Sequence, residues 1–310
     1  VMNIKYRADI DGLRAIAVIL VIFFHLDNRL IPSGFIGVDI FFVISGFLIS
    51  LIIKTSLLQG HFSFGDFYIR RLWRLQPLYL FVLVAVLVIS GIFYLPSDYL
   101  DITNSEKYAS AFLSNKYFAR ATTSYAAQDA LFLPLLHTWS LAIEWQWYLF
   151  LPFVLYFLHK INHKEKINNF YFIVFITIIS FSLVLVYQKD QPKNYYYFST
   201  RIFEFMLGAC VAYLPVKVII NQRVNSVISL IALGVIFWIA VQKDVIAGYP
   251  NFNTLYVCLS VALIIYTGQH GSIIQKVLSL KPIVIIGLLS YSLYLWHWPL
   301  ICYCALYRRI

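Results

Sequence analysis

Apolar stretches of about the length needed to cross a lipid bilayer recur along almost the whole chain. A helix needs roughly 20 mostly apolar residues to cross the hydrocarbon core. We expect such spans at about 11–27, 35–53, 75–94, 138–158, 170–187, 202–214, 226–241, 254–267 and 283–304, of which the sixth and the eighth are short. The sequence therefore predicts an all-α fold, a polytopic transmembrane bundle of about nine helices.

The composition excludes a soluble protein. Of the 310 residues, 61% are hydrophobic and only 12% are charged, whereas about 25% of the residues in average chains are charged. The formal net charge of +10 would also suit nucleic acid, but the basic residues are scattered over short loops. Orientation in an anionic membrane explains them better, so we expect the lipid bilayer and no nucleic acid as a partner. The cysteines lie in or beside apolar stretches, and no spacing indicates a metal site.

Lysine and arginine residues give the bundle a direction. If the N-terminus lies inside, thirteen of them fall in inner segments and five in short outer loops. The positive-inside rule therefore predicts a cytoplasmic N-terminus. Residues 95–136 then form a long outer loop within a single domain, 1–310. Nine spans also place the basic tail at 307–310 outside, against the rule, so we expect either a miscounted span or a chain that stops before a returning helix.

Arg14 and His25 are ionisable residues inside the first apolar run. Eleven residues of helix return to nearly the same face, about 16 Å further along the axis. Such residues in a membrane span are functional-site candidates by default. The imidazole pKa near 6.5 suits a general base that removes a proton from an alcohol. The alternatives are that Arg14 reaches the inner headgroups and that His25 hydrogen-bonds a backbone carbonyl at the interface.

Three charged residues in later spans have two interpretations each. Asp39 lies early in the second span and is either the partner of a buried cation or a site residue. Arg201 and Glu204, three residues apart at the start of the sixth span, form either a structural salt bridge or part of a site.

Arg71 and Arg74 lie in the inner segment 67–77, which we read as a loop. They share one side if the segment is helical. Two arginines so placed suit phosphate oxygens through bidentate hydrogen bonds. The alternative explanation is that these arginines determine the topology of the protein in the membrane and contact lipid headgroups.

A dense polar cluster opens the fourth span. His137, Ser140 and Glu144 recur there at helical spacing, but parallel side chains on one helix make a poor nucleophilic triad. Glu144, two turns inside the span, is better placed to orient or pair with a buried base. His297 is a further titratable group in the last span, where interfacial aromatic residues explain much of the remaining sequence.

Taken in order, these segments resemble the membrane acyltransferase 3 family, bacterial O-acyltransferases that modify surface and secreted polysaccharides. The resemblance runs from Tyr6 to about Pro299. The matching segments are 7–18, the Arg14–His25 pair, 37–49, Arg71-x-x-Arg74-x-x-Pro77, 137–141, Arg201-x-x-Glu204-Phe205 and 290–299. The chain departs from the family at 144–148, where Glu-Trp-Gln-Trp-Tyr replaces Glu-Glu-Gln-Phe-Tyr, and it ends before the family's usual tenth span.

The resemblance implies a multi-pass O-acyltransferase of the bacterial inner membrane, most simply an O-acetyltransferase. The donor would be cytoplasmic acyl-CoA, usually acetyl-CoA, and the acceptor a hydroxyl of a surface glycan such as lipopolysaccharide O-antigen. No bound cofactor is expected. Arg14 and His25 would be the functional pair, with Arg71 and Arg74 in a second site motif.

The resemblance and the residue chemistry together assign expected roles. Arg71 and Arg74, with Arg14, would hold the coenzyme A phosphates, and His25 would deprotonate the acceptor, oriented by Glu144 or Asp39. The expected acceptor-binding residues are His137, Ser140, Arg201, Glu204 and His297. A transporter of glycan or acyl precursors would also need a polar path between helices. A truncated, inactive remnant is the other alternative.

Overall fold

The computed structural model describes residues 6–121, 130, 132–165, 169–187, 193–214, 221–243 and 245–307. Within these ranges the regular structure is helical, and no β-strand occurs. Residues 122–129 and 131 of the expected outer loop, and residues 308–310 of the basic tail, lie outside the described residues.

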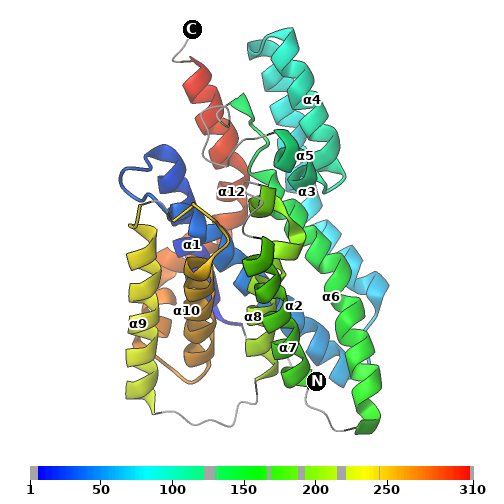
Figure 1. Ribbon diagram of the computed structural model, residues 1–310, viewed down its shortest axis with the longest axis vertical. Helices are drawn as coiled ribbons and strands as arrows, with labels where there is room; N and C mark the ends of the chain where they lie inside the picture. The colour runs from blue at the N-terminus through cyan, green and yellow to red at the C-terminus, as the bar shows by residue number, and fades with distance from the viewer. Residues whose placement is uncertain are drawn as a thin grey trace. The chain divides into compact units, whose positions relative to one another are not determined.

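Each apolar window expected from the sequence forms a helix (Figure 1). These helices are α1 (Ala8–Leu26), α2 (Gly37–Leu58), α3 (Phe64–Phe93), α6 (Thr138–Glu165), α7 (Asn169–Tyr187), α8 (Phe198–Tyr213), α9 (Gln222–Ala240), α10 (Phe252–Gln269) and α12 (Lys281–Tyr307). Among the described residues, seven helices are long and apolar enough to cross a membrane. The criterion omits α1, which carries Asp9, Asp11 and Arg14, and α8, which has 16 residues. The predicted all-α, multi-pass bundle is confirmed.

The inner segment 67–77 is not a loop, contrary to expectation. It belongs to α3, a continuous helix of 30 residues that begins at Phe64. The Ser63 side chain caps its start by accepting a hydrogen bond from the backbone N–H of Asp66. Arg71 and Arg74 therefore lie on a helix, about one turn apart.

The expected outer loop 95–136 is largely helical in its described part. It contains α4 (Pro96–Ser110) and α5 (Ser114–Ala121). Pro96 occupies the first turn of α4, where its missing N–H costs no helical hydrogen bond. These helices are polar and too short to span a bilayer, so they agree with a segment outside the apolar spans.

The chain divides into two compact units. The first unit comprises residues 1–62, 147–189 and 199–290, and the second comprises 63–146, 190–198 and 291–310. In the first unit α10 packs against α9, α2 and the short helix α11 (Ile273–Leu278), and α1 packs against α2 and α11. Helix α2 is the buried centre of this unit, because 72% of its most apolar window is inside the protein against 22% for α7.

Glycines allow α2 and α8 to touch along their backbones. A β-carbon added at Gly46 would lie 2.0 Å from the carbonyl oxygen of Phe205, and one added at Gly208 would lie 2.0 Å from that of Val43. Small residues at such contacts are the usual packing device of membrane helices. The close approach brings the polar start of α8 against the start of α2.

In the second unit α4 packs against α3 and α5, and α5 packs against the 3₁₀ helix η3 (Lys193–Tyr196). Hydrogen bonds link these helices. The Tyr79 hydroxyl of α3 donates to the Ala109 carbonyl of α4 at 2.9 Å, and the Asn115 amide of α5 donates to the Tyr196 carbonyl of η3 at 3.1 Å.

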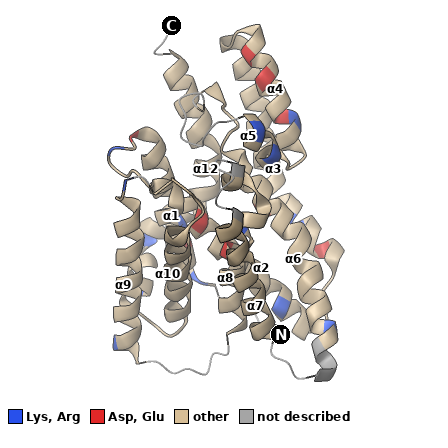
Figure 2. Cartoon of the chain, in the orientation of Figure 1, with Lys and Arg blue, Asp and Glu red and all other residues tan. Residues whose placement is uncertain are grey.

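Charged residues are sparse on the spanning helices, as Figure 2 shows. Helices α7 and α10 contain no Lys, Arg, Asp or Glu. Their exposed side chains include Ile178, Val186 and Leu259, which suits contact with lipid. The charged groups that do lie inside the bundle are therefore the candidates for function.

Candidate active site

Helix α1 carries both ionisable residues that the sequence singled out. It runs without interruption from Ala8 to Leu26, with Arg14 in its first half and His25 in its last turn. Arg14 is 20% exposed, and its Nη1 donates to Asp11 Oδ1 at 2.8 Å. The half-buried His25 ring meets Phe24 edge-on, with centroids 5.0 Å apart. One helix thus presents a cation and an imidazole about 16 Å apart.

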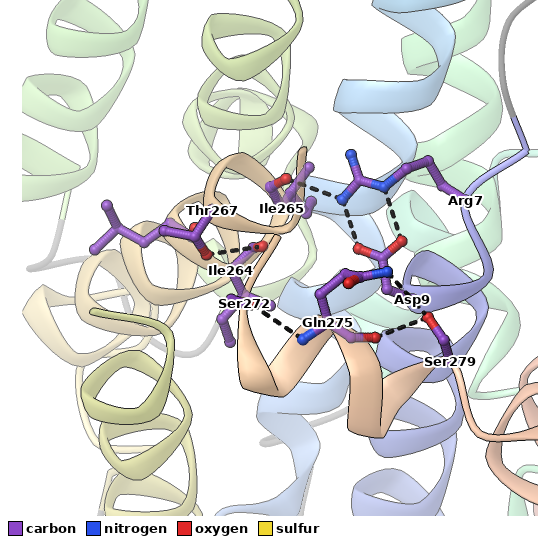
Figure 3. Close-up of polar contacts among 9 residues, drawn as sticks. Arg7, Asp9, Ile264, Ile265, Thr267, Ser272, Gln275 and Ser279 are labelled. Carbon is purple, nitrogen blue, oxygen red and sulfur yellow. Dashed lines mark hydrogen bonds and ion pairs between the residues drawn. The ribbon is translucent and has the colours of Figure 1, made fainter. Parts of the chain in front are cut away.

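The start of α1 is held by a second ion pair (Figure 3). The Arg7 guanidinium donates to both carboxylate oxygens of Asp9, and its Nη2 also donates to the Ile265 carbonyl of α10 at 3.0 Å. A β-carbon at Gly12 would lie 2.2 Å from the carbonyl oxygen of Leu278. The beginning of α1 is therefore fixed against α10 and the end of α11.

A buried charge cluster joins α2, α8 and the loop between α9 and α10. Arg201 Nη1 donates to Asp39 Oδ1 and to Glu204 Oε1, each at 2.9 Å. The Tyr249 hydroxyl donates to the other oxygen of Asp39. The Arg201 guanidinium carbon also lies 5.2 Å from the centre of the Tyr249 ring. Asp39 is thus the partner of a buried cation, and the Arg201–Glu204 salt bridge is formed.

The cluster contains more carboxyl groups than guanidinium groups. Two carboxyl groups share one guanidinium, and the side chains of all three are at most 1% exposed. Asp39 accepts hydrogen bonds on both oxygens, whereas Glu204 Oε2 has no hydrogen-bond partner among the described residues. Because a buried charge without partners is costly, the hydrogen bonds on both oxygens stabilise the Asp39 carboxylate better than the single bond stabilises Glu204.

A second polar group assembles in the other unit, from the start of α6 and the middle of α12. The Ser140 and Tyr294 hydroxyls lie 2.6 Å apart, and the Tyr294 hydroxyl lies 3.2 Å from the His137 carbonyl. The His137 and His297 rings meet edge-on at 5.7 Å. His297 Nδ1 lies 2.6 Å from the Tyr294 carbonyl, which can only accept, so this nitrogen carries hydrogen. The structure brings together three predicted acceptor residues from two distant segments.

The remaining predicted residues also lie in the second unit. Arg71 is half-buried, with its guanidinium carbon 5.8 Å from the Phe67 ring centre, and Arg74 is exposed. Glu144 is half-buried within α6. No group of three or more His, Cys, Asp or Glu side chains in the described ranges is arranged to hold a metal ion.

Tyr249 is a residue of the charge cluster that the sequence did not indicate. It lies in the short α9–α10 loop, outside every apolar window, and is 3% exposed. Burial and the neighbouring Asp39 carboxylate raise the pKa of Tyr249 well above its ordinary value, so its phenol stays neutral and donates. No local pattern marks such a residue, because its partners come from other helices.

Comparison with known proteins decides the family. A family model described as an acyltransferase domain matches residues 7–309. The chain belongs to the acyltransferase 3 family. No solved structure shows a significant match.

Curated relatives in this family carry O-acetyltransferase names. O-acetyltransferase OatA of Staphylococcus aureus is 33% identical over 96% of this chain and 51% of its own length. Peptidoglycan O-acetyltransferase OatA of Listeria monocytogenes is 33% identical over 96% of the chain and 50% of its own. A putative O-acetyltransferase of S. aureus is 34% identical over 97% and 52%. The chain thus spans about half the length of the curated relatives that it matches.

Proposed function

We propose that this chain transfers an acetyl group from cytoplasmic acetyl-CoA to a hydroxyl of a cell-envelope glycan. The proposal rests above all on two observations. The chain belongs to the acyltransferase 3 family, and its helix α1 carries both Arg14 and His25 without interruption. The bacterial cytoplasmic membrane is the proposed location, with the N-terminus inside. In the transfer, the hydroxyl oxygen attacks the thioester carbonyl carbon, the C–S bond breaks, and the coenzyme A thiol leaves.

The proposed roles follow the direction of α1. Arg71, Arg74 and Arg14 bind the coenzyme A phosphates at the inner side, where guanidinium groups suit phosphate oxygens. His25 accepts the proton of the acceptor hydroxyl at the outer side and passes it to the leaving thiolate. Transfer through a covalent carrier would use the same base.

Peptidoglycan is our first candidate for the acceptor. The name of the Listeria relative, a peptidoglycan O-acetyltransferase, supports this choice. Lipopolysaccharide O-antigen, which the family resemblance suggested, becomes the second candidate. The polar group of His137, Ser140, Tyr294 and His297 offers hydroxyls and imidazoles of the kind that sugar hydroxyls bond.

The base assignment is tested with His25→Ala in cells that express the protein. We expect acetyl release from purified peptidoglycan by mild alkali to fall about 100-fold or more, which is the usual contribution of a general base. His61→Ala is the matched control, because His61 is exposed between α2 and α3. Near-normal acetylation in His25→Ala would remove the assignment. Acetyl found on lipopolysaccharide instead of peptidoglycan would change the acceptor.

The donor site is tested with Arg71→Ala and Arg74→Ala in membrane vesicles, by thioester release from acetyl-CoA. Each lost charge-assisted hydrogen bond should raise the KM for acetyl-CoA about tenfold or more. Arg223→Ala, an exposed arginine at the start of α9, is the charge-matched control. Unchanged KM values in both variants would refute the donor assignment. Movement of substrate without thioester loss would indicate a transporter.

A further inference from the structure

Tyr249 connects the buried charge cluster to the helix end that carries His25. Its hydroxyl donates to Asp39, and its ring meets the Phe35 ring at 4.9 Å and 90°. Phe35 in turn meets Phe24 at 5.4 Å and 72°, and Phe24 meets the His25 ring at 5.0 Å. Edge-to-face pairs at these distances are the favoured aromatic arrangement. Four rings from three segments of one unit thus form a continuous series that ends at the imidazole.

The members of this series leave each other little freedom. Tyr249, Phe35 and Phe24 are 3%, 1% and 8% exposed, so their rings are enclosed by neighbours. Close-packed interiors transmit a displacement from one side chain to the next. A shift of the Tyr249 ring would therefore displace the ring of Phe24, which precedes His25 in the last turn of α1.

Hydrogen bonds to backbone carbonyls also join the α1–α2 connection to the loop between α9 and α10. In the segment that follows α1, the Ser33 N–H donates to the Ala240 carbonyl at 2.9 Å, and the Ser33 hydroxyl donates to the Gln242 carbonyl at 2.7 Å. Both acceptors lie where α9 gives way to the loop that contains Tyr249. The loop is thus anchored to the α1–α2 connection by the two hydrogen bonds that Ser33 donates, and to α2 by the side chain of Tyr249.

We propose that Tyr249 is a positioning residue for His25, acting through Phe35 and Phe24. The hydrogen bond to Asp39 sets the tilt of the Tyr249 ring. This ring packs against Phe35 and so fixes the aromatic series that ends at the His25 imidazole. The charge cluster is then part of the support of the catalytic histidine. This inference rests on the proposed function, since it assigns the importance of His25 to acyl transfer.

The experiment uses the full protein in membranes, with Tyr249→Phe as the principal variant. Phenylalanine keeps the ring and its packing but removes the bond to the Asp39 carboxylate. We expect kcat for acetyl transfer to fall about tenfold, as for one lost hydrogen bond to a charged group, with KM for acetyl-CoA unchanged. Tyr249→Leu, which also removes the ring, should lower kcat further. Tyr256→Phe in α10, which is 49% exposed, is the control expected to match the wild type.

A second readout follows the imidazole directly and does not depend on activity. Diethyl pyrocarbonate modifies accessible histidines, and mass spectrometry of the α1 peptide gives the rate for His25. We expect Tyr249→Phe to change this rate relative to wild type and Tyr256→Phe, while the rate for the exposed His61 stays constant. If Tyr249→Leu fails to fold, Tyr249→Phe still decides the question.

The outcomes separate the two proposals. Wild-type kcat and wild-type His25 labelling in Tyr249→Phe would overturn the positioning role, whatever His25→Ala does. A change in His25 labelling together with full activity of His25→Ala would leave the support intact and defeat the proposed base instead. A parallel rise in KM and loss of folded protein in Tyr249→Phe would mean a general structural role and would also overturn the inference.

Discussion

At the scale of single residues, the first unit depends on Arg201. This arginine is 0% exposed and bonds two carboxyl groups through one nitrogen. Removal of one member of a buried ion pair leaves the other charge without compensation, at a cost of about 3–5 kcal/mol. The unequal charges of the cluster mean that its members should differ greatly in their tolerance of substitution.

Glu204→Gln and Arg201→Met test this difference. The glutamine oxygen can still accept from Arg201, and the substitution removes the excess negative charge, so we expect a stability within about 1 kcal/mol of wild type. Arg201→Met should lose about 3–5 kcal/mol. Thermal unfolding in detergent, followed by fluorescence size-exclusion chromatography, measures both. Arg223→Met at the exposed start of α9 is the control. Equal losses in the two buried variants would contradict the charge argument.

Only part of this cluster was readable from the sequence. The Arg201–Glu204 bond follows from a spacing of three residues on one helix. The bonds to Asp39 and from Tyr249 join residues 162 and 210 positions apart, and no periodicity relates them. Asp39 was recognisable because a buried acid needs a partner, whereas Tyr249 carries no charge in an unremarkable loop. The roles of Arg14, His25, Arg71, Arg74 and Glu144 stay predictions.

At the scale of elements, the contact between α2 and α8 decides where the cluster forms. Gly46 and Gly208 face the partner helix's backbone so closely that no β-carbon fits. A side chain there would push the helices apart and separate Asp39 from Arg201. The glycines are therefore as necessary to the ion pairs as the charged groups are.

A pair of glycine-to-alanine substitutions tests this contact. Gly208→Ala puts a methyl group 2.0 Å from a backbone oxygen, and we expect a loss of about 1–3 kcal/mol or more. Gly234→Ala in α9 meets nothing within 4 Å, so better helix propensity should stabilise the protein by about 0.5–1 kcal/mol. Melting temperatures in detergent should move in opposite directions. A stable Gly208→Ala variant would show that the helices can separate without harm.

Apolar windows predicted the spanning helices well and the other helices poorly. Each window recurs as a helix because length and hydropathy suffice for a membrane segment. The prediction of a loop at 67–77 is wrong because the arginines end the apolar window, whereas arginine, leucine and glutamine are good helix formers. Helix α4 lies in a polar stretch, where hydropathy gives no signal and the proline in its first turn is the main cue.

At the scale of the whole molecule, the expected orientation is open to a direct test. The excess of basic residues in the inner segments predicts that the loop between α2 and α3 is cytoplasmic and that α4 is outside. Three of the four native cysteines are buried, and Cys304 is exposed, so Cys304→Ser gives a suitable background. In that background, His61→Cys and Asn104→Cys place single thiols at exposed positions of the two regions.

A membrane-impermeant maleimide should label Asn104→Cys in intact cells. His61→Cys should react only after the cells are opened, because its thiol would face the cytoplasm. The reverse labelling pattern would mean that the bundle has the opposite orientation in the membrane. Arg71 and Arg74 would then lie on the side away from cytoplasmic coenzyme A. Labelling of both in intact cells would mean that the span between them is miscounted.

The glycine contact at the start of α1 also sets how that helix is turned about its own axis. Gly12 lets the Leu278 carbonyl reach the helix backbone, and a β-carbon at Gly287 would lie 1.8 Å from the Asp11 carbonyl. A rotation of α1 would carry a bulkier residue into either contact, so its azimuth is fixed. Arg14 lies two residues beyond Gly12, and His25 lies just over three full turns beyond Arg14. The direction in which both side chains leave the helix is thus set by two residues that have no side chain.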